Sequence, residues 1–136
     1  MTEPFVIEPM MQKSTGDCGI VCLKMLIGCT YAQVFEALSK RAQKTAIADG
    51  ATVFQFIKAA KRLGVELEYH DADFDPDKLG ILVLDRTVND DQHQVLWLQG
   101  CLYNPADGLI YTDLETYLTK CLYRVEGFLS IKRRIQ

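Results

Sequence analysis

Residues 12–19 have the sequence Gln-Lys-Ser-Thr-Gly-Asp-Cys-Gly and lead into an almost wholly apolar segment. From Cys18 to Leu26 the large apolar residues recur at helical spacing, which predicts a helix over this segment. A helix that is apolar on all sides has to be covered by other elements. We therefore expect Cys18 to begin a helix in the middle of the domain, with Gly28 marking its end.

A thiol at the first position of a helix is placed where it can be activated. It lies at the positive end of the helix dipole, close to amides that have no partner within the helix. Both effects favour the thiolate, which is the nucleophilic form of cysteine, and Gly19 leaves room for a substrate backbone. By position alone, however, Cys18 fits a small buried helix residue better than a nucleophile.

The rest of the sequence predicts more helices first and strands afterwards. Thr30 and Gln33 have the spacing of a capping box, which predicts a second helix after Thr30. A third helix is predicted over residues 51–63, with Gly64 at its C-terminal end and a loose link over residues 39–49 before it. Apolar patterns predict strands over residues 65–70, 81–84, 93–98, 101–103 and 127–133, with a short helix over 113–120. This order predicts an α+β domain with a mostly antiparallel sheet.

Length and composition narrow the class of protein. The 136 residues suffice for one domain, residues 1–136, and 49% hydrophobic with 24% charged residues is ordinary for a globular chain. The net charge of −3 argues against a nucleic-acid partner. The first residues do not resemble a signal peptide, and Lys24 interrupts the longest apolar run, which is too short to cross a bilayer. We therefore expect a soluble, cytoplasmic protein with no membrane partner, whose oligomeric state the sequence leaves open.

The cysteines and histidines do not suggest a metal site or a disulfide framework. The five cysteines are odd in number and include no Cys-x-x-Cys pair. The two histidines, His70 and His93, are far apart in the sequence and supply no evident ligand set. We therefore expect neither a metal nor another cofactor.

Three further residues could join Cys18 in a reactive site. Gln12 precedes Cys18 in the loop that leads to the helix, where its amide could donate to an oxyanion. His93 begins a strand whose inward residues would be Val95 and Trp97. On the next strand, Asn104 could accept a hydrogen bond from one ring nitrogen of His93 and orient the imidazole. Taken singly, a solvated glutamine, a core histidine and a plain turn at Asn104 are the ordinary alternatives.

Together, these residues have the chain order of a papain-like site: Gln, Cys at a helix start, His at a strand start, then Asn. Residues 12–19 resemble the active-site segment of the bacteriocin-processing (double-glycine leader) peptidase family, the peptidase C39-like superfamily. Residues 93–98 and 104–108 resemble that family's His-x-Val-Val-Leu strand and Asp-Pro-x-x-Gly turn. The resemblance implies a papain-like fold, with a central nucleophile helix among N-terminal helices packed on a C-terminal antiparallel sheet. It departs at Asn104, where that family usually has Asp.

The resemblance implies a cysteine peptidase or related amide hydrolase that acts on a peptide or protein. Cys18 would be the nucleophile, His93 the general base, Asn104 the residue that orients His93, and Gln12 the oxyanion donor. The alternative is a catalytically silent papain-like domain that binds a peptide or protein partner. Asn104 favours the alternative, because an amide cannot stabilise an imidazolium by charge, whereas the retention of both Cys18 and His93 favours the enzyme.

Several other polar residues are predicted to have structural roles only. We expect Asp17 to cap the helix that Cys18 begins, Asp90 and Asp91 to lie in a solvated turn, and His70 to be a surface residue without a partner. Trp97 should belong to the core. The remaining cysteines should pack as small apolar groups: Cys22, Cys29, Cys101 and Cys121.

Overall fold

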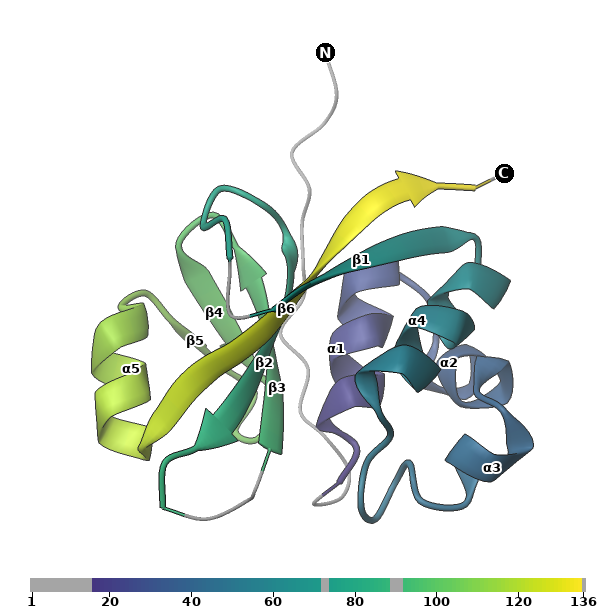
Figure 1. Ribbon diagram of the computed structural model, residues 1–136, viewed down its shortest axis with the longest axis horizontal. Coiled ribbons are helices and arrows are strands. Elements are labelled where there is room, and N and C mark those ends of the chain that lie inside the picture. The colour runs from purple at the N-terminus through teal and green to yellow at the C-terminus, as the bar shows by residue number, and fades with distance from the viewer. Residues whose placement is uncertain (1–15, 72–73, 89–91, 136) are drawn as a thin grey trace.

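A six-stranded antiparallel sheet separates two groups of helices (Figure 1). The computed structural model describes residues 16–71, 74–88 and 92–135. In this part of the chain, helices α1 to α4 lie on one side of the sheet and α5 lies on the other. The strand order is β1-β6-β2-β3-β4-β5, and each neighbouring pair is antiparallel. The predicted α+β class is confirmed, whereas the single-domain extent of residues 1–136 stays a prediction.

The first helix has the predicted start and the predicted stop at Gly28, and the second helix begins where the sequence predicts. Helix α1 spans Cys18–Ile27 and stops at Gly28, which has a left-handed backbone with φ of +81°. Helix α2 spans Tyr31–Ala37 and begins with a complete capping box between Thr30 and Gln33. Local capping chemistry therefore sets the short turn that redirects the chain between the two helices.

The predicted loose link is partly helical. Ser39 caps a short helix, α3 (Lys40–Gln43), by accepting a hydrogen bond from the Ala42 amide. Helix α4 spans Val53–Arg62 and starts two residues later than predicted, because Thr52 and Gln55 form a second capping box there. The prediction of a loose link over residues 39–49 therefore missed the short helix in its first part.

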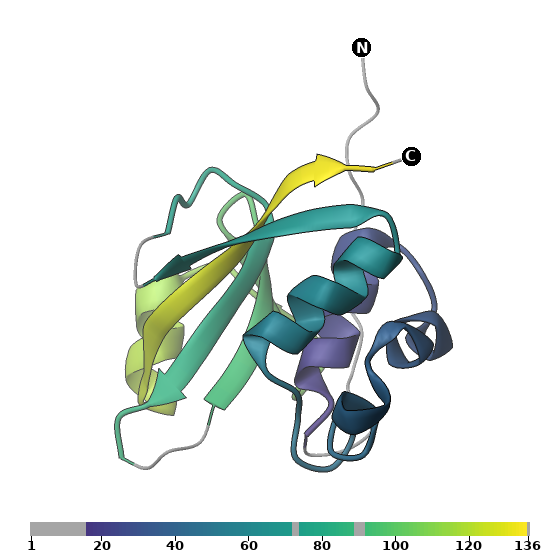
Figure 2. The same ribbon diagram turned by 45° about the vertical axis from the view of Figure 1, so that its right-hand side comes forward.

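The strands form a ladder in which β6 (Tyr123–Arg134) lies between β1 (Val65–Asp71) and β2 (Gly80–Arg86). The remaining strands are β3 (Gln92–Leu98), β4 (Cys101–Asn104) and β5 (Leu109–Tyr111). Strand β6 begins four residues before its predicted start, and β5 was not predicted. Figure 2 shows β1 and β6 crossing the molecule side by side, above the helical side.

Each face of the sheet has its own hydrophobic core. On one face, α1, α2 and α4 pack on strand residues that include Leu67, Ile81, Leu96 and Leu129. On the other face, helix α5 (Leu114–Cys121) contributes the buried Tyr117 to a second cluster. The strand residues of that cluster are Leu82, Leu84, Val95, Trp97, Leu102 and Phe128. Strands β2 and β3 are therefore buried on both faces, which explains their nearly continuous apolar sequences.

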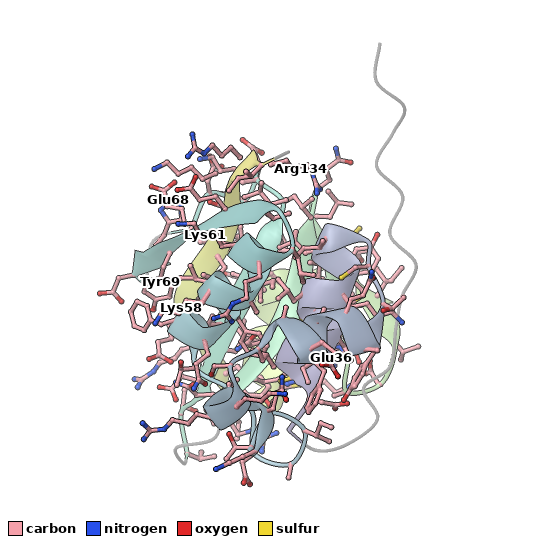
Figure 3. All side chains as sticks on the ribbon, turned by 90° about the vertical axis from the view of Figure 1, so that its right-hand side faces the viewer. Glu36, Lys58, Lys61, Glu68, Tyr69 and Arg134 are labelled. Carbon is pink, nitrogen blue, oxygen red and sulfur yellow. The ribbon has the colours of Figure 1, made fainter. Side chains whose placement is uncertain are left out.

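Charged residues gather on the outer surface of the helical side. Figure 3 labels Glu36 on α2 and Lys58 and Lys61 on α4 there. The basic C-terminal segment also lies at the surface, where Arg133 of β6 forms an ion pair with Glu66 of β1. Such an exposed pair adds little stability, so the two cores rather than surface charges hold the helices on the sheet.

Gly80, the first residue of β2, is crowded by β6. A Cβ atom at Gly80 would overlap the backbone carbonyl oxygen of Leu129 on β6. Gly127, on β6, is also crowded, but its neighbour is the side chain of Tyr69. The Leu129 backbone cannot move without breaking the hydrogen bonds between β2 and β6, whereas the Tyr69 side chain can rotate.

We therefore expect Gly80→Ala to lower the free energy of unfolding by about 1–3 kcal/mol and Gly127→Ala to lower it by less. Urea unfolding followed by Trp97 fluorescence measures both values. Equal costs for the two variants would contradict the distinction between a fixed backbone neighbour and a movable side-chain neighbour.

Candidate active site

The start of α1 is held in place by a buried carboxylate. Asp17 precedes Cys18 and is fully buried. Among the described residues its carboxylate makes no capping bond to α1; instead it accepts a hydrogen bond of 2.8 Å from the Tyr31 hydroxyl. Asp17 therefore holds the predicted N-cap position of α1, but within the described part of the chain its side chain makes no capping bond and contacts a tyrosine at the start of α2 instead. This bond joins the first turns of α1 and α2.

His93 and Asn104 are in contact across the sheet, as predicted. The Nε2 atom of His93, on β3, lies 2.7 Å from Oδ1 of Asn104, the last residue of β4. Both side chains are buried, with exposed fractions of 8% and 6%. The same Oδ1 accepts a hydrogen bond from the Ala106 amide at 3.2 Å. Since Oδ1 is an acceptor, Nε2 carries the proton, and in the neutral ring Nδ1 is left as an acceptor.

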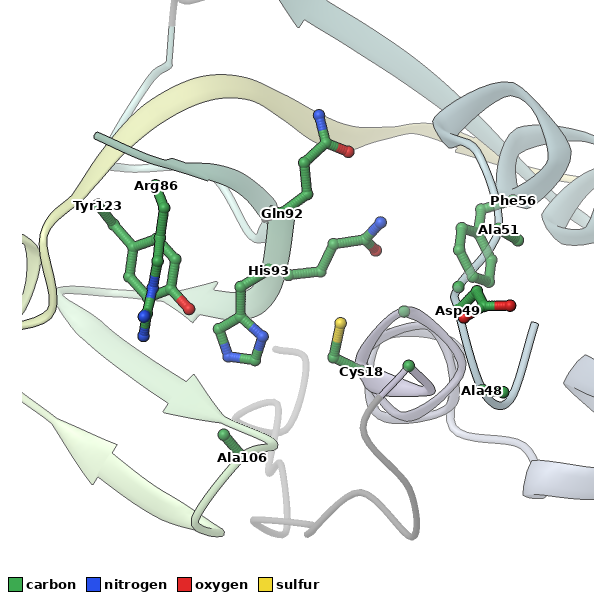
Figure 4. Close-up of a pocket in the computed structure, with 14 residues that line it drawn as sticks. Cys18, Ala48, Asp49, Ala51, Phe56, Arg86, Gln92, His93, Ala106 and Tyr123 are labelled. Atoms are coloured by element: carbon green, nitrogen blue, oxygen red, sulfur yellow. The ribbon is translucent and has the colours of Figure 1, made fainter. Parts of the chain in front are cut away.

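Cys18 and His93 line one pocket of about 690 Å³. Figure 4 shows their side chains beside each other, Cys18 from α1 and His93 from β3, in the gap between the helical side and the sheet. One wall consists of the loop before α4 together with Phe56, and the other consists of the ends of β2, β3 and β6. The lining residues are Gly16, Cys18, Gly19, Ala48, Asp49, Gly50, Ala51, Phe56, Arg86, Gln92, His93, Gln94, Ala106 and Tyr123.

Burial dominates the electrostatics of both reactive groups. It raises the pKa of Cys18, and the Asp17 charge raises it further, while hydrogen bonds with the backbone of Gln94 and Gly19 lower it. The expectation that the helix start favours the thiolate is therefore outweighed by burial. Burial also lowers the pKa of His93, and the hydrogen bond to Asn104 opposes that shift. At neutral pH the resting pair is accordingly a neutral thiol and a neutral imidazole.

Two residues that no sequence motif indicated hold the ring of His93. The Tyr123 ring stacks on it, with 5.7 Å between ring centroids and 21° between planes. The Arg86 guanidinium lies 5.1 Å from the centroid of the Tyr123 ring, and its charge contributes to the lowered pKa of His93. Both residues are at strand ends distant in sequence from the His93 motif, so only the folded sheet brings them together.

Gln94 contributes a buried polar atom to the pocket. Its side chain is 7% exposed, and its Oε1 atom has no hydrogen-bond partner among the described residues. A Cβ atom on Gly19 would lie 2.9 Å from this oxygen and would overlap the Phe56 ring. A side chain at position 19 would therefore fill the space between Phe56 and Gln94 in the pocket wall.

The remaining predicted residues have mixed outcomes. Gln12, Asp90 and Asp91 lie outside the described residues, so their roles stay predictions. Trp97 is buried, as expected. His70, expected to be without a partner, has its Nε2 atom 3.0 Å from the Ser130 hydroxyl. Among the other cysteines only Cys22 is buried; Cys29, Cys101 and Cys121 are partly exposed, and all of them are free thiols.

The described part of the chain contains neither a cluster of metal-binding side chains nor a single membrane-spanning helix. Within it, no group of three or more His, Cys, Asp or Glu side chains is arranged to hold a metal ion. No single described helix is long and apolar enough to cross a membrane. Helices α1 and α2 are long and apolar enough only when taken together, and the chain bends by 108° between them.

Comparison with known proteins identifies the family. The sequence model of the peptidase C39 family matches residues 7–93, which is more than half of the chain and includes both Cys18 and His93. The chain belongs to the peptidase C39 family. This membership confirms the resemblance found in the sequence. No curated protein sequence matches the chain.

The fold of this C39 family member also matches a solved structure. The crystal structure of a double glycine motif protease from an AMS/PCAT transporter, in complex with the leader peptide, superposes with a TM-score of 0.61. The two chains are 17% identical, and the match covers 97% of this chain and 94% of the other. At this identity the likeness establishes the shared fold.

Replacing Asn104 by Asp tests the electrostatic role of this position. A carboxylate beside Nε2 of His93 favours the imidazolium, so we expect Asn104→Asp to raise the pKa of His93 and Asn104→Ala to lower it. An NMR titration of the two histidine rings measures both shifts, with His70 as the internal reference. An unchanged His93 titration in Asn104→Asp would show that the 2.7 Å contact does not control the imidazole.

A side chain at position 19 should collide with the pocket wall. We expect Gly19→Ala to lower the free energy of unfolding by about 1–3 kcal/mol, as overpacking usually does. Combining it with Phe56→Leu, which removes ring atoms next to the new methyl group, should cost less than the sum of the two single variants. Strict additivity in urea unfolding would mean that Phe56 is not the obstacle.

Proposed function

We propose that this chain is a cysteine peptidase that hydrolyses an amide bond in a peptide or protein substrate through Cys18, His93 and Asn104. The observation that carries the proposal is the 2.7 Å contact between His93 Nε2 and Asn104 Oδ1, behind a pocket that Cys18 and His93 share. It leaves Nδ1 of His93 as the free basic atom of the site. Family membership supports the same reaction class.

The proposed reaction begins from the neutral pair. His93 Nδ1 takes the Cys18 proton as the sulfur attacks the substrate carbonyl carbon, which gives a tetrahedral oxyanion. The backbone amide of Cys18 would donate a hydrogen bond to that oxygen. The Gln12 side chain would donate a second one, which stays a prediction. His93 then protonates the leaving amine, and water, deprotonated by His93, releases the acyl group from sulfur.

A peptide substrate suits the proposed reaction. The similar solved structure is a double glycine motif protease bound to a leader peptide, and we extend this kind of ligand to the present chain as part of the proposal. The pocket supports it because Gly16, Gly19 and Gly50 are among its lining residues and carry no side chains that would fill it. Such a wall suits a closely approaching substrate backbone. No cofactor is required, and a cytoplasmic location without nucleic-acid or membrane partners stays a prediction.

The competing proposal is a catalytically silent domain that binds a peptide. The upward shift of the Cys18 pKa and the amide at position 104 are the observations that favour it. In such a domain the pocket would hold its ligand without the thiol taking part, so Cys18→Ser would leave peptide affinity unchanged.

Thiol labelling separates the two proposals. If His93 is the base for Cys18, iodoacetamide should label Cys18 at pH 7 faster than Cys29, Cys101 or Cys121. The Cys18 rate should then fall about tenfold or more in His93→Ala, in line with the loss of a general base. Peptide mass spectrometry measures each cysteine separately, and His70→Ala is the matched control, which should change nothing. If Cys18 labels no faster than the control thiols, the silent domain becomes the better proposal.

A further inference from the structure

The turn between β4 and β5 contains a carboxylate whose two oxygens are both held. The Leu109 amide donates to Oδ1 of Asp107 at 2.9 Å. The Tyr111 hydroxyl donates to Oδ2 of the same residue. Within the turn, the Gly108 amide also donates to the Asn104 carbonyl at 2.8 Å. Asp107 is therefore fixed in orientation and belongs to the turn that begins at Asn104.

Tyr111 connects this carboxylate to Asn104. Leu102 pairs with Tyr111 and Asn104 pairs with Leu109 in the ladder between β4 and β5, so Asn104 and Tyr111 are diagonal neighbours on one face. The Oδ1 atom of Asn104 is occupied by His93 and Ala106. Its amide nitrogen is a hydrogen-bond donor on the face of the sheet that Asn104 shares with Tyr111.

Packing and charge support the same connection. The Tyr111 ring packs against the buried Tyr117, with 4.9 Å between ring centroids. The hydrogen bond to Asp107 is the largest cause of the raised pKa of Tyr111, so this phenol stays a proton donor at neutral pH. The negative charge of Asp107 also acts on His93, where it opposes the lowering of the pKa by burial and by Arg86.

We propose that Asp107 is a positioning residue of the active site, which acts through the Tyr111 hydroxyl to orient the Asn104 amide and to supply negative charge to His93. The inference rests on the proposed function, because it assigns Asp107 to the Cys18–His93 pair. Asn104 can accept from His93 and donate to Tyr111 at once, whereas a carboxylate at that position could only accept. In this arrangement the neutral Asn104 and the carboxylate of Asp107 together take the place of one carboxylate directly beside His93.

The test uses Asp107→Asn and Tyr111→Phe, with Asp77→Asn as the matched control. Asp77 is an exposed carboxylate just before the start of β2. Leu84, the residue that pairs with His93, lies near the other end of that strand. Asp77→Asn changes the net charge by the same amount as Asp107→Asn, but it leaves the turn between β4 and β5 intact. The first readout is the NMR titration of the His93 ring in the whole protein, with His70 as reference. The second is the pH dependence of Cys18 labelling by iodoacetamide.

The groups that face His93 are Cys18 from α1, Arg86 from β2, Asn104 from β4, Asp107 from the turn and Tyr123 from β6. Among them Asp107 is the one carboxylate. We therefore expect Asp107→Asn to lower the pKa of His93. Cys18 labelling at pH 7 should slow by roughly twofold to tenfold, the range for losing one hydrogen bond. Tyr111→Phe should change both readouts in the same direction, Asp107→Glu should restore part of the loss, and Asp77→Asn should match the wild type.

A purely structural turn would give another result. If Asp107→Asn unfolds more easily but His93 titrates as in the wild type, the proposal is overturned. It is also overturned if Tyr111→Phe leaves both readouts unchanged, since the carboxylate would then act without the hydroxyl. Should Asp107→Asn fail to fold, Tyr111→Phe still decides, because it keeps the carboxylate and its bond to the Leu109 amide.

Failure of the proposed function is distinguishable from failure of this inference. If wild-type Cys18 labels slowly, the peptidase proposal fails. In that case the His93 titration still reports whether Asp107 acts on the ring. An unchanged pKa of His93 in Asp107→Asn would then overturn this inference as well. If wild-type Cys18 labels quickly and the two variants match it, the peptidase proposal stands and the role of Asp107 is overturned.

Discussion

The burial of α1 is the constraint on which the rest of the structure depends. A helix with apolar residues on every side must be covered completely, and here the covering elements are α2, α4 and the sheet. Its first residue, Cys18, thereby comes to lie beside β3, and the bond between Asp17 and Tyr31 fixes the first turn. Cys18 and His93 are therefore positioned by helix and strand packing rather than by a mobile loop.

The same burial makes ionisation of the site costly. It raises the pKa of Cys18 and lowers that of His93, so a separated thiolate and imidazolium are disfavoured at rest. Any ion pair that forms during a reaction has to be stabilised by groups already in place. The backbone near Gln94 and Gly19 serves the sulfur, and Asn104 serves the imidazole. Preorganised dipoles of this kind need no rearrangement when the charge develops.

Strong local signals in the sequence predicted most of the helical side. The apolar run after Cys18, the left-handed Gly28 and the capping box at Thr30 all have the predicted structure. The contact between His93 and Asn104 followed from strand order. Helix α3 and strand β5 were missed because four and three residues are too few to show a period.

The parts of the site that were missed depend on tertiary contacts. Tyr123 and Arg86 belong to no motif, and Tyr31 takes the Asp17 carboxylate from a position 14 residues away. The pKa directions could not be predicted either, because they follow from burial that only the completed fold provides. The position of Cys18 at the start of a helix indicated an activated thiol, whereas burial in the surrounding protein decides whether that thiol is protonated.

The order of the elements along the chain has a consequence for synthesis. Cys18 leaves the ribosome long before His93 and Asn104, which belong to strands of the second half. The early segment contains the Cys18 thiol but none of the strand residues that line the pocket. The pocket is assembled only when β2, β3 and β6 pair, because its sheet wall consists of the ends of these three strands. The nascent chain therefore carries Cys18 without the complete pocket until β6 has been made.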